Sequence, residues 1–418
     1  MTPEIKQRID KICHGEVPEG YQRTFLGIAP KSWDKSRIDK ICRLSSGSTP
    51  RRDAVENFAG DILWVTSGEL KRRTIEDTQE KISETAVVNS HLEIYDPGTV
   101  VIAIYGLEAA GIRGTVSIIR KQCTISQACM AFTEFKGIDN EFFYYWYLNN
   151  GQVIGLRYAQ GTKQQNLSTD IVGSFPICFP SQGEQQKIAA ILTTQDRVIE
   201  LKEKRLAEKQ RQKKYLMQQL LTGKKRLPGF YGAWSFPKAK ELFQSVSDKD
   251  HNGDLAVLSS TQDRGIVPRD EVDIDIKYDA CSLVNYKKVS KGNFVISLRS
   301  FQGGIEYSTY TGLVSPAYTV LSSRKEISDR YYKQFFKSTD YINRLNVAVY
   351  GIRDGKQISY EDFGRLRIPY PPIKEQDAIA EVLSTADREI ELLQQDIEQE
   401  KQKKKALMQL LLTGIVRV

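Results

Sequence analysis

The sequence has little of what metal centres and disulfide-stabilised folds require. Only six cysteines and three histidines occur in 418 residues, and no two cysteines form a Cys-x-x-Cys pair. Such scattered residues lack the spacing of a structural zinc site. We therefore expect reduced thiols and a cytoplasmic location, since disulfides are rare in that compartment.

Long apolar runs are also missing, although 40% of the residues are hydrophobic. No stretch approaches the ~20 consecutive apolar residues that a membrane-spanning helix needs. Residues 1–8 lack the apolar centre of a signal peptide. The sequence therefore predicts a protein without a membrane partner, and its length allows two or three domains.

Catalytic motifs are absent as well. There is no Gly-x-x-x-x-Gly-Lys-Ser/Thr loop for nucleotide phosphates and no Asn/Asp-Pro-Pro-aromatic tetrapeptide of the amino-methyltransferase kind. Asp61, Glu69 and Lys71 form a nuclease-like set, but such sets are common in charged chains. Gly303 and Gly304 could cradle a phosphate, although two glycines more often form a tight turn. An enzyme with its own active site therefore stays an alternative, testable at Asp61 and Glu69.

The sequence does contain a long internal repeat. Residues 184–223 return at residues 375–414 with a constant offset of 191, and 20 of the 40 positions are identical. Both copies end in Leu-Leu-Thr-Gly, and Gly223 and Gly414 are natural helix stops. A repeat of this length divides the chain into two halves, each closed by the same segment.

Each copy has the pattern of a long helix that pairs with another helix. Apolar residues recur at spacings of three and four, as in a coiled-coil seam, and about 40 residues would extend over roughly 60 Å. Lys209 and Glu400 occupy equivalent seam positions with opposite charge, so we expect the copies to pair with each other. The seam residues are Ile188, Leu192, Ile199, Leu206, Leu216 and Leu220 in the first copy and Ile379, Leu383, Ala386, Ile390, Leu393, Ile397, Leu407 and Leu411 in the second.

Two modules of similar size accompany these helices. Each combines predicted strands with an aromatic helix whose rings should serve packing. The fold we expect is α+β, with two α/β modules separated by two long antiparallel coiled-coil helices and a pseudo-two-fold internal repeat. Strands are predicted at 62–66, 99–105, 115–119, 255–258, 294–298 and 318–321, and aromatic helices at 141–148 and 329–337. The predicted boundaries are 1–26 for an N-terminal segment, 27–180 and 224–372 for the modules, and 181–223 and 373–418 for the helices.

The net charge of +8 is concentrated in one stretch. Residues 200–226 hold ten Lys and Arg against three Glu. Such a run could face phosphates or could be the solvated face of a helix, and charge alone does not separate the two. Polar loops near 161–168 and 351–359 close the modules, and their Lys, Arg, Gln and Asn side chains suit base edges and phosphates.

Several further motifs accompany the repeat, and together they resemble the motifs of one known family. They are residues 46–50, 60–65, 161–168, 175–180, 292–297, 299–304 and 368–371, together with the Glu-Gln starts and Leu-Leu-Thr-Gly ends of both helices. Over nearly its full length, the chain resembles the specificity subunit of Type I restriction-modification systems. It departs from the pattern at 372–374, where the serine that precedes the first helix has no counterpart.

The resemblance implies a DNA-binding subunit without catalysis of its own. In such systems, each target recognition domain reads one half of a bipartite, asymmetric site in double-stranded DNA, and the helices set the spacing. The helices also dock two methyltransferase subunits, and restriction-translocase subunits join that core. The resemblance implies no cofactor in this chain, because partner subunits use the S-adenosylmethionine, ATP and Mg. A coiled-coil scaffold that binds only protein is an alternative of a different class.

Candidate contact residues follow from side-chain chemistry, since Arg and Lys suit guanine or phosphate and Gln and Asn suit adenine. In the first module the DNA candidates are Ser48, Thr49, Arg51, Arg52, Lys71, Arg72, Arg73, Arg113, Lys163, Gln164, Gln165 and Asn166. In the second they are Arg264, Arg299, Ser300, Gln302, Tyr307, Arg353, Lys356 and Gln357. The candidates for partner docking are Leu216, Met217, Leu220, Leu221, Leu407, Met408, Leu411 and Leu412. Adjacent leucines cannot both lie on one seam, so a recognition domain or a partner must bury the second.

Overall fold

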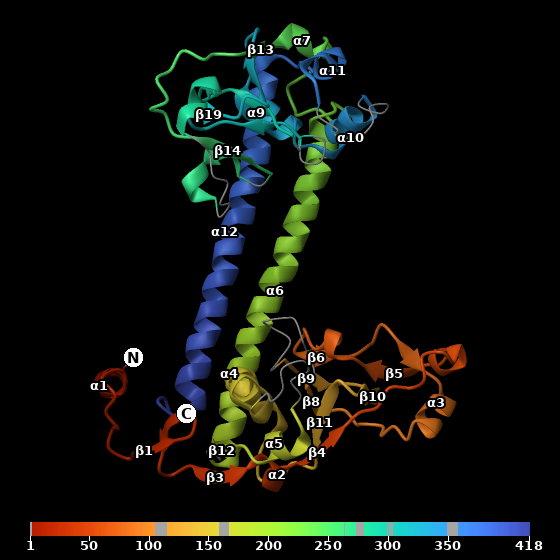
Figure 1. Cartoon of the computed structure of the whole chain (residues 1–418), viewed down its shortest axis with the longest axis vertical. Coiled ribbons are helices and arrows are strands. Elements are labelled where there is room, and N and C mark those ends of the chain that lie inside the picture. Colours follow the sequence, from red (N-terminus) through yellow and green to blue (C-terminus); the bar gives the residue numbers. More distant parts are fainter. Residues whose placement is uncertain are drawn as a thin grey trace. The chain divides into compact units, whose positions relative to one another are not determined.

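The computed structural model describes residues 2–104, 115–158, 167–262, 264–272, 280–298, 300, 304–348 and 358–418. Two compact units are present (Figure 1). The first consists of Met1–Leu201 with Ile397–Val418, and the second of Lys202–Asp396. Each unit therefore combines one module with parts of both long helices. Because packing divides the chain in this way, the boundaries predicted along the sequence stay predictions.

The first unit is built around a five-stranded sheet with the order β4-β11-β8-β9-β6. These strands are β4 (Arg43–Ser46), β11 (Cys129–Thr133), β8 (Val100–Ala103), β9 (Val116–Ile119) and β6 (Thr74–Ile75), and only β6 and β9 are parallel. A smaller sheet contains β10 (Cys123–Ile125), β5 (Ile62–Val65) and β7 (Lys81–Ile82). Two pairs complete the strands: β1 (Tyr21–Thr24) with β2 (Gly27–Pro30), and β3 (Asp34–Arg37) with β12 (Pro176–Phe179).

The first unit also contains the helices α1 (Pro3–Cys13), α2 (Ile38–Ile41), α3 (Glu84–Asn89), α4 (Asn140–Tyr158) and α5 (Thr169–Gly173), with 3-10 turns η1 (Val55–Phe58) and η2 (Ser67–Glu69). Of these helices, α4 packs against β9 and α5 against β4. Helix α4 contains the predicted aromatic run. Its Phe143 and Tyr147 are fully buried, and the Phe143 ring meets Phe132 of β11 edge-on with centroids 4.9 Å apart. The prediction that these rings serve packing is confirmed.

The second unit has a four-stranded antiparallel sheet with the order β13-β20-β17-β18. Its strands are β13 (Phe243–Val246), β20 (Thr319–Ser323), β17 (Phe294–Ile296) and β18 (Glu306–Tyr307). Two antiparallel pairs join β14 (Leu258–Thr261) to β15 (Gly265–Pro268) and β16 (Lys287–Val289) to β19 (Gly312–Val314). The helices are α7 (Ala239–Leu242), α9 (Asp329–Phe335), α10 (Thr339–Ala348) and α11 (Tyr360–Arg365), with turns η3 (Arg269–Glu271) and η4 (Ala280–Asn285).

Five of the six predicted strands coincide with observed strands. The exception is 255–258, because the strand there is β14, which begins at Leu258. The turn that follows β14 sets this register. Gly265 has a φ of +78°, which favours glycine, and it pairs with Thr261. The ladder therefore extends over 258–261, after the predicted segment.

The two long helices are α6 (Gln182–Leu220) and α12 (Ile373–Leu412), drawn in green and blue in Figure 1. Within each unit they are antiparallel, because residues late in one helix contact residues early in the other. The contacts are Gln195–Glu400 and Asp196–Lys404 in the first unit, and Lys202–Asp396, Lys209–Glu389 and Lys213–Asp387 in the second. The predicted α+β fold with two modules and paired antiparallel helices is confirmed.

Both helices end at the predicted glycines. Gly223 has a φ of +72° and Gly414 a φ of +69°, the left-handed conformation that ends helices. The Leu-Leu pair before Gly414 packs into the core of the first unit, and the pair before Gly223 packs into the core of the second. Each core therefore combines the beginning of one long helix with the end of the other.

Candidate nucleic-acid interface

One edge of the first unit's sheet gathers the ends of several segments. In the pairing of β11, Cys129 lies opposite Ala103 of β8, and Met130 lies opposite Ser46 of β4. The end of β4, which leads into Ser48, therefore lies beside the end of β8. The Ser48 backbone N–H donates to the carbonyl of Ile125 at 3.2 Å, which fixes this turn.

Two loops with predicted DNA contacts begin or end at the same edge. The Leu167 N–H donates to the carbonyl of Ile104 at 3.3 Å, and the Ala103 N–H donates to that of Thr115 at 3.2 Å. The described residues that flank 105–114 and 159–166 thus meet. The candidates Arg113, Lys163, Gln164, Gln165 and Asn166 belong to these segments and lie outside the described residues.

Lys71 and Arg72 lie close to this edge. The Arg72 carbonyl accepts a hydrogen bond from the Ser117 hydroxyl at 2.6 Å, next to the start of β9. Both cationic side chains are exposed, and neither has an ion pair within the described part of the chain. Ser48 and Thr49 are half-buried nearby. These four residues have the chemistry for phosphate or base contacts and stay candidates.

Arg51 and Arg52 are exposed but already have partners. Arg51 pairs with Asp53 at 2.9 Å, and Arg52 pairs with Glu80 while its guanidinium lies 4.6 Å from the centre of the Phe58 ring. The hydrogen bond from Arg52 lowers the pKa of Glu80. Exposed ion pairs of this kind are weak, so a phosphate could compete for either arginine.

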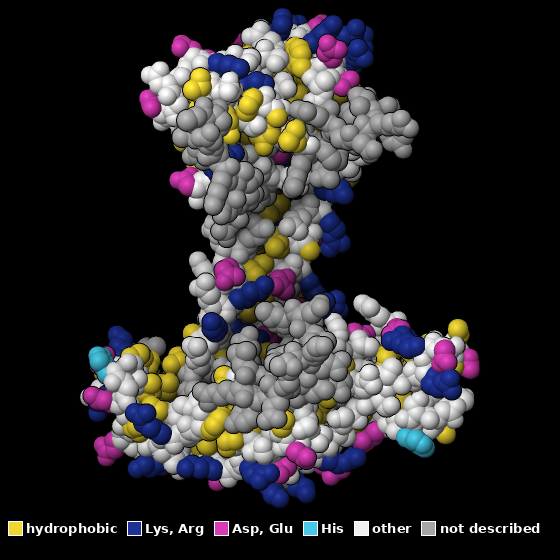
Figure 2. All heavy atoms as spheres, in the orientation of Figure 1, with side chains coloured by type: hydrophobic (Ala, Val, Ile, Leu, Met, Phe, Trp, Pro, Cys, Tyr) yellow, Lys and Arg dark blue, Asp and Glu magenta, His cyan; other side chains and the backbone are white. Residues whose placement is uncertain are grey.

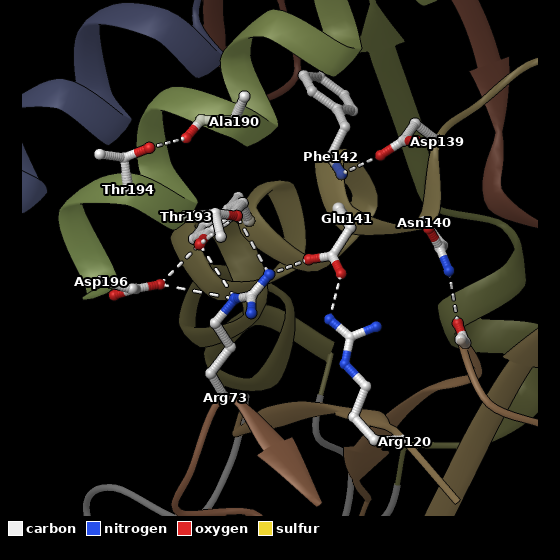
Figure 3. A network of polar contacts seen from close by, with 12 residues as sticks. Arg73, Arg120, Asp139, Asn140, Glu141, Phe142, Ala190, Thr193, Thr194 and Asp196 are labelled. Atoms are coloured by element: carbon white, nitrogen blue, oxygen red, sulfur yellow. Dashed lines mark hydrogen bonds and ion pairs between the residues drawn. The ribbon is translucent and has the colours of Figure 1, made fainter. Parts of the chain in front are cut away.

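Arg73 is half-buried and its guanidinium is already bound by groups of the helices, which disfavours the predicted DNA contact. Figure 3 shows its guanidinium pointing toward Glu141 of α4 and Thr193 of α6. It donates to the Thr193 hydroxyl at 3.1 Å and to the Tyr145 hydroxyl at 3.1 Å, and it forms an ion pair with Glu141. Arg73 therefore joins the sheet to the helices.

Asp196 is the centre of a three-way contact in the same network. Tyr145 of α4 donates its hydroxyl to Asp196 at 2.6 Å, and Lys404 of α12 forms an ion pair with Asp196 at 2.6 Å. Burial raises the pKa of Tyr145, and the Asp196 carboxylate raises it further. The hydroxyl therefore stays protonated and donates to the carboxylate.

The second unit repeats this contact with a different donor from its module. Asp387, the counterpart of Asp196, accepts a hydrogen bond from Gln334 of α9 at 2.6 Å. Lys213, the counterpart of Lys404, forms an ion pair with Asp387 at 2.5 Å. The helices thus offer the same carboxylate to both modules, and each module supplies its own donor.

The edge of the second unit's sheet contains Ser300 just after β17. The Ser300 hydroxyl accepts a hydrogen bond from the Ser297 N–H at 2.8 Å, and the residue is 1% exposed. Its predicted DNA contact is wrong, because a buried hydroxyl cannot reach DNA. Gly304 has a φ of +82°, and its N–H donates to the Ser300 carbonyl at 2.9 Å. This geometry favours the tight-turn interpretation of Gly304.

The other candidates of the second unit differ in accessibility. Arg264 is exposed in the turn between β14 and β15 and donates to the Glu271 carbonyl at 2.8 Å. Tyr307 is half-buried, with its ring 5.2 Å from that of Phe294. Burial raises the pKa of Tyr307, and Asp329 raises it further. The candidates Arg299, Gln302, Arg353, Lys356 and Gln357 lie outside the described residues.

The basic stretch at 200–226 is partly explained by helix pairing. Four of its ten cations bind acids of α12. On the face in Figure 2, Lys and Arg are interspersed with Asp and Glu along the helices. These cations are Lys202, Lys209, Lys213 and Arg226. Charge in this stretch therefore joins the two helices, in addition to any role toward phosphate.

The leucines proposed for partner docking lie in the chain's own cores. Of the eight candidates, five are buried and three are half-buried. The buried ones are Leu220 and Leu221 in the second unit, and Met408, Leu411 and Leu412 in the first. Partner docking through these five is wrong, because the chain's own modules, the other alternative, already cover them. Leu216, Met217 and Leu407 pack against the same cores.

Glu69 of the nuclease-like set has both carboxylate oxygens bound within the chain. Glu69 Oε2 accepts a hydrogen bond from the Thr66 N–H at 2.8 Å, and Oε1 accepts one from the Gln79 N–H at 2.7 Å. Glu69 therefore stabilises a turn. Among the described residues, no group of three or more His, Cys, Asp or Glu could hold a metal ion, and no helix is long and apolar enough to cross a membrane.

One pair of contacts was not predicted. Arg226, beyond the end of α6, donates to Glu375 at the start of α12, and Arg417, beyond the end of α12, donates to Glu184 at the start of α6. Both glutamates are buried. The sequence contains the signal, because the two Arg–Glu sets are related by the same offset of 191.

Proteins of known classification are similar to this chain in sequence. The chain is 30% identical over 188 residues to the Type I restriction enzyme MjaIX specificity subunit of Methanocaldococcus jannaschii, covering 44% of this chain and 42% of that protein. It is 23% identical over 418 residues to the MjaVIII specificity subunit of the same organism, covering 93% and 94%. The chain thus spans less than half of the first relative and nearly all of the second.

A solved structure shares the fold, and a family model matches both halves of the chain. The S subunit of a Type I restriction-modification system from M. genitalium has a TM-score of 0.55 at 15% identity, covering 91% of this chain and 96% of that one. The model of the Type I restriction modification DNA specificity domain matches residues 30–211 and 233–402. With both modules and most of both helices matched, the chain belongs to the Type I restriction-modification specificity family.

Proposed function

We propose that this chain is the DNA sequence-specificity subunit of a Type I restriction-modification complex and has no catalysis of its own. Each module acts as a target recognition domain for one half of a bipartite, asymmetric site in double-stranded DNA. The paired helices set the distance between the half-sites. The observation that carries this proposal is the reciprocal packing, in which each of two unlike modules packs against the start of one long helix and the end of the other.

The complex would contain two methyltransferase subunits and restriction-translocase subunits in the cytoplasm. S-adenosylmethionine, ATP and Mg would be used by those partners, and this chain would bind none of them. The family assignment supports the partners, and the role of Glu69 in a turn supports a non-catalytic chain. DNA contact through the first module is supported by the exposed Lys71 and Arg72 near the sheet edge.

Modification-sensitive genome sequencing of cells that carry this chain with its methyltransferase subunit tests the proposal. The expected result is one adenine-methylation motif with two defined half-sites and a fixed gap, and no methylation or cleavage by the isolated chain. Methylation without sequence preference would favour the scaffold alternative. Cleavage or methylation by the isolated chain that is lost on changing Asp61 or Glu69 would favour an enzyme.

A further inference from the structure

Three consecutive basic residues between η2 and β6 have contrasting surroundings. Lys71 and Arg72 are exposed, and Arg73 is half-buried. The two exposed side chains are candidates for DNA contact, whereas the Arg73 guanidinium binds groups of α4 and α6. One short segment therefore faces the solvent with two residues and a long helix with the third.

The backbone of this segment is fixed to β9. The Arg72 carbonyl accepts a hydrogen bond from the Ser117 hydroxyl at 2.6 Å, and the Arg73 carbonyl accepts one from the Ile118 N–H at 2.8 Å. The next residue, Thr74, begins β6 and pairs with Ile118 in the parallel ladder. The segment therefore moves with the sheet and is not an independent loop.

From this fixed backbone, the Arg73 side chain reaches two helices (Figure 3). Its Nη2 donates to the Thr193 hydroxyl of α6 at 3.1 Å and forms the ion pair with Glu141 of α4. Its Nε donates to the Tyr145 hydroxyl of α4 at 3.1 Å. A planar guanidinium that donates along several edges fixes an angle as well as a distance.

The second long helix joins the same network through Asp196. The Arg73 Nε lies 3.8 Å from Asp196 Oδ2, and Lys404 of α12 forms an ion pair with the Asp196 carboxylate at 2.6 Å. The side chains of Arg73 and Asp196 are only 22% and 19% exposed, so their polar contacts are stronger than those of a surface pair. The sheet, α4, α6 and α12 are therefore joined at one point.

We propose that Arg73 is a positioning residue for site recognition: it holds the sheet of the first module at one angle to the helix pair and so restricts the gap between the half-sites. The inference rests on the proposed function, under which the sheet edge beside Lys71 and Arg72 contacts DNA and the helices set the gap. A module released from α6 keeps its own base contacts but can take more than one angle to the helices. The chain then accepts half-sites at other separations.

Methylation rates on duplexes with altered gaps test this inference. The full-length chain, in complex with the methyltransferase subunit, is given duplexes that contain both half-sites of its methylation motif with the native gap, one base pair less or one base pair more. For Arg73→Met, we expect the preference for the native gap to fall about tenfold, because the charged hydrogen bonds that hold the angle are lost. The bases of both half-sites should be unchanged.

Thr193→Val removes the acceptor on α6 and leaves the ion pair between Arg73 and Glu141 in place. It should weaken the gap preference in the same direction, and it decides the question if Arg73→Met does not fold. Arg120→Met is the matched control, because Arg120 at the end of β9 pairs with the same Glu141 at 2.5 Å but joins the sheet to α4 and not to α6. This variant should keep the gap preference of the unchanged chain.

The inference is overturned if the folded Arg73 and Thr193 variants methylate the three duplexes with unchanged relative rates, since the contacts would then serve stability alone. It is also overturned if Arg120→Met loses the gap preference as strongly, or if Arg73→Met changes the bases of a half-site. If the unchanged chain with its methyltransferase subunit shows no preference for any gap, the proposed function itself fails.

Discussion

At the scale of single residues, one buried glutamate anchors the start of each long helix. Glu375 accepts hydrogen bonds from Arg226 at 2.5 and 2.6 Å and from the Trp234 indole at 2.9 Å. Glu184 accepts two from Arg417, both at 2.6 Å. Charge-assisted hydrogen bonds to a buried carboxylate are strong because water cannot compete for that carboxylate.

Glu375→Gln should lower the free energy of unfolding by ~2 kcal/mol, because Arg226 loses its counter-ion. Urea denaturation followed by circular dichroism measures the change. Glu381→Gln is the control, since Glu381 pairs with Arg330 and Arg388 at the surface and should change stability little. Equal losses in the two variants would contradict the importance of burial.

Lys71 and Arg73 are two residues apart and should behave differently. Lys71→Ala should reduce the slope of DNA affinity against salt by about one charge and leave stability unchanged. Arg73→Ala should leave that slope unchanged and lower the free energy of unfolding by about 2 kcal/mol, because it breaks the contacts with Glu141, Tyr145 and Thr193. DNA-binding titrations across salt concentrations check both. An equal reduction of the salt slope in both variants would show that Arg73 contacts DNA.

The sequence could suggest these residues but could not assign their roles. Arg73 and Lys71 have similar chemistry, and only the contacts of Arg73 with α4 and α6 separate this half-buried, paired arginine from an exposed lysine. Ser300 looks like a polar loop residue, yet its hydroxyl closes a turn. Composition reports what a side chain can bind, whereas burial decides what it reaches.

At the scale of elements, prediction from the sequence was more successful. The long helices follow from their seam and their glycine stops, which depend on local spacing alone. The opposite charges at Lys209 and Glu400 predicted that the two unlike copies pair with each other, although these residues bind Glu389 and Gln195 and not one another. The sequence could not show what covers the leucine pair at the end of each long helix, because burial by a module and burial by a partner give the same sequence pattern.

Gly414→Ala should destabilise the chain more than Gly223→Ala. Both glycines have left-handed backbones, which cost an alanine ~1–2 kcal/mol. A Cβ on Gly414 would also lie 2.5 Å from Pro30, whereas one on Gly223 would lie 3.0 Å from Trp234. Thermal unfolding of the two variants should show the lower midpoint for Gly414→Ala. The reverse order would contradict the tighter packing at Gly414.

At the scale of the whole molecule, the proposed spacing of the half-sites depends on helix length. Seven residues inserted after Lys202 in α6 and seven after Gln395 in α12 would preserve the pairing, because Lys202 binds Asp396. The helix pair would lengthen by about 10 Å, or roughly three base pairs. Methylation sequencing should then return the same half-sites with a gap longer by about three base pairs.

The matched control inserts seven residues in α6 alone. This change, made after Lys202 as before, shifts the later part of α6 against α12, so the ion pairs Lys209–Glu389 and Lys213–Asp387 cannot form together with the contacts of the first unit. We expect loss of methylation from that variant. An unchanged gap in the doubly lengthened chain would show that the helices do not measure the distance.

The sharing of both long helices also determines the order in which the chain can fold during synthesis. The second unit consists of Lys202–Asp396, so it is complete before the ribosome reaches the last 22 residues. The first unit, although its module is made first, lacks Met408, Leu411 and Leu412 until residues 397–418 have also been made. The usual sequence, in which the N-terminal part matures first, is therefore inverted here. The core of the first unit is therefore complete only after the second unit has been made.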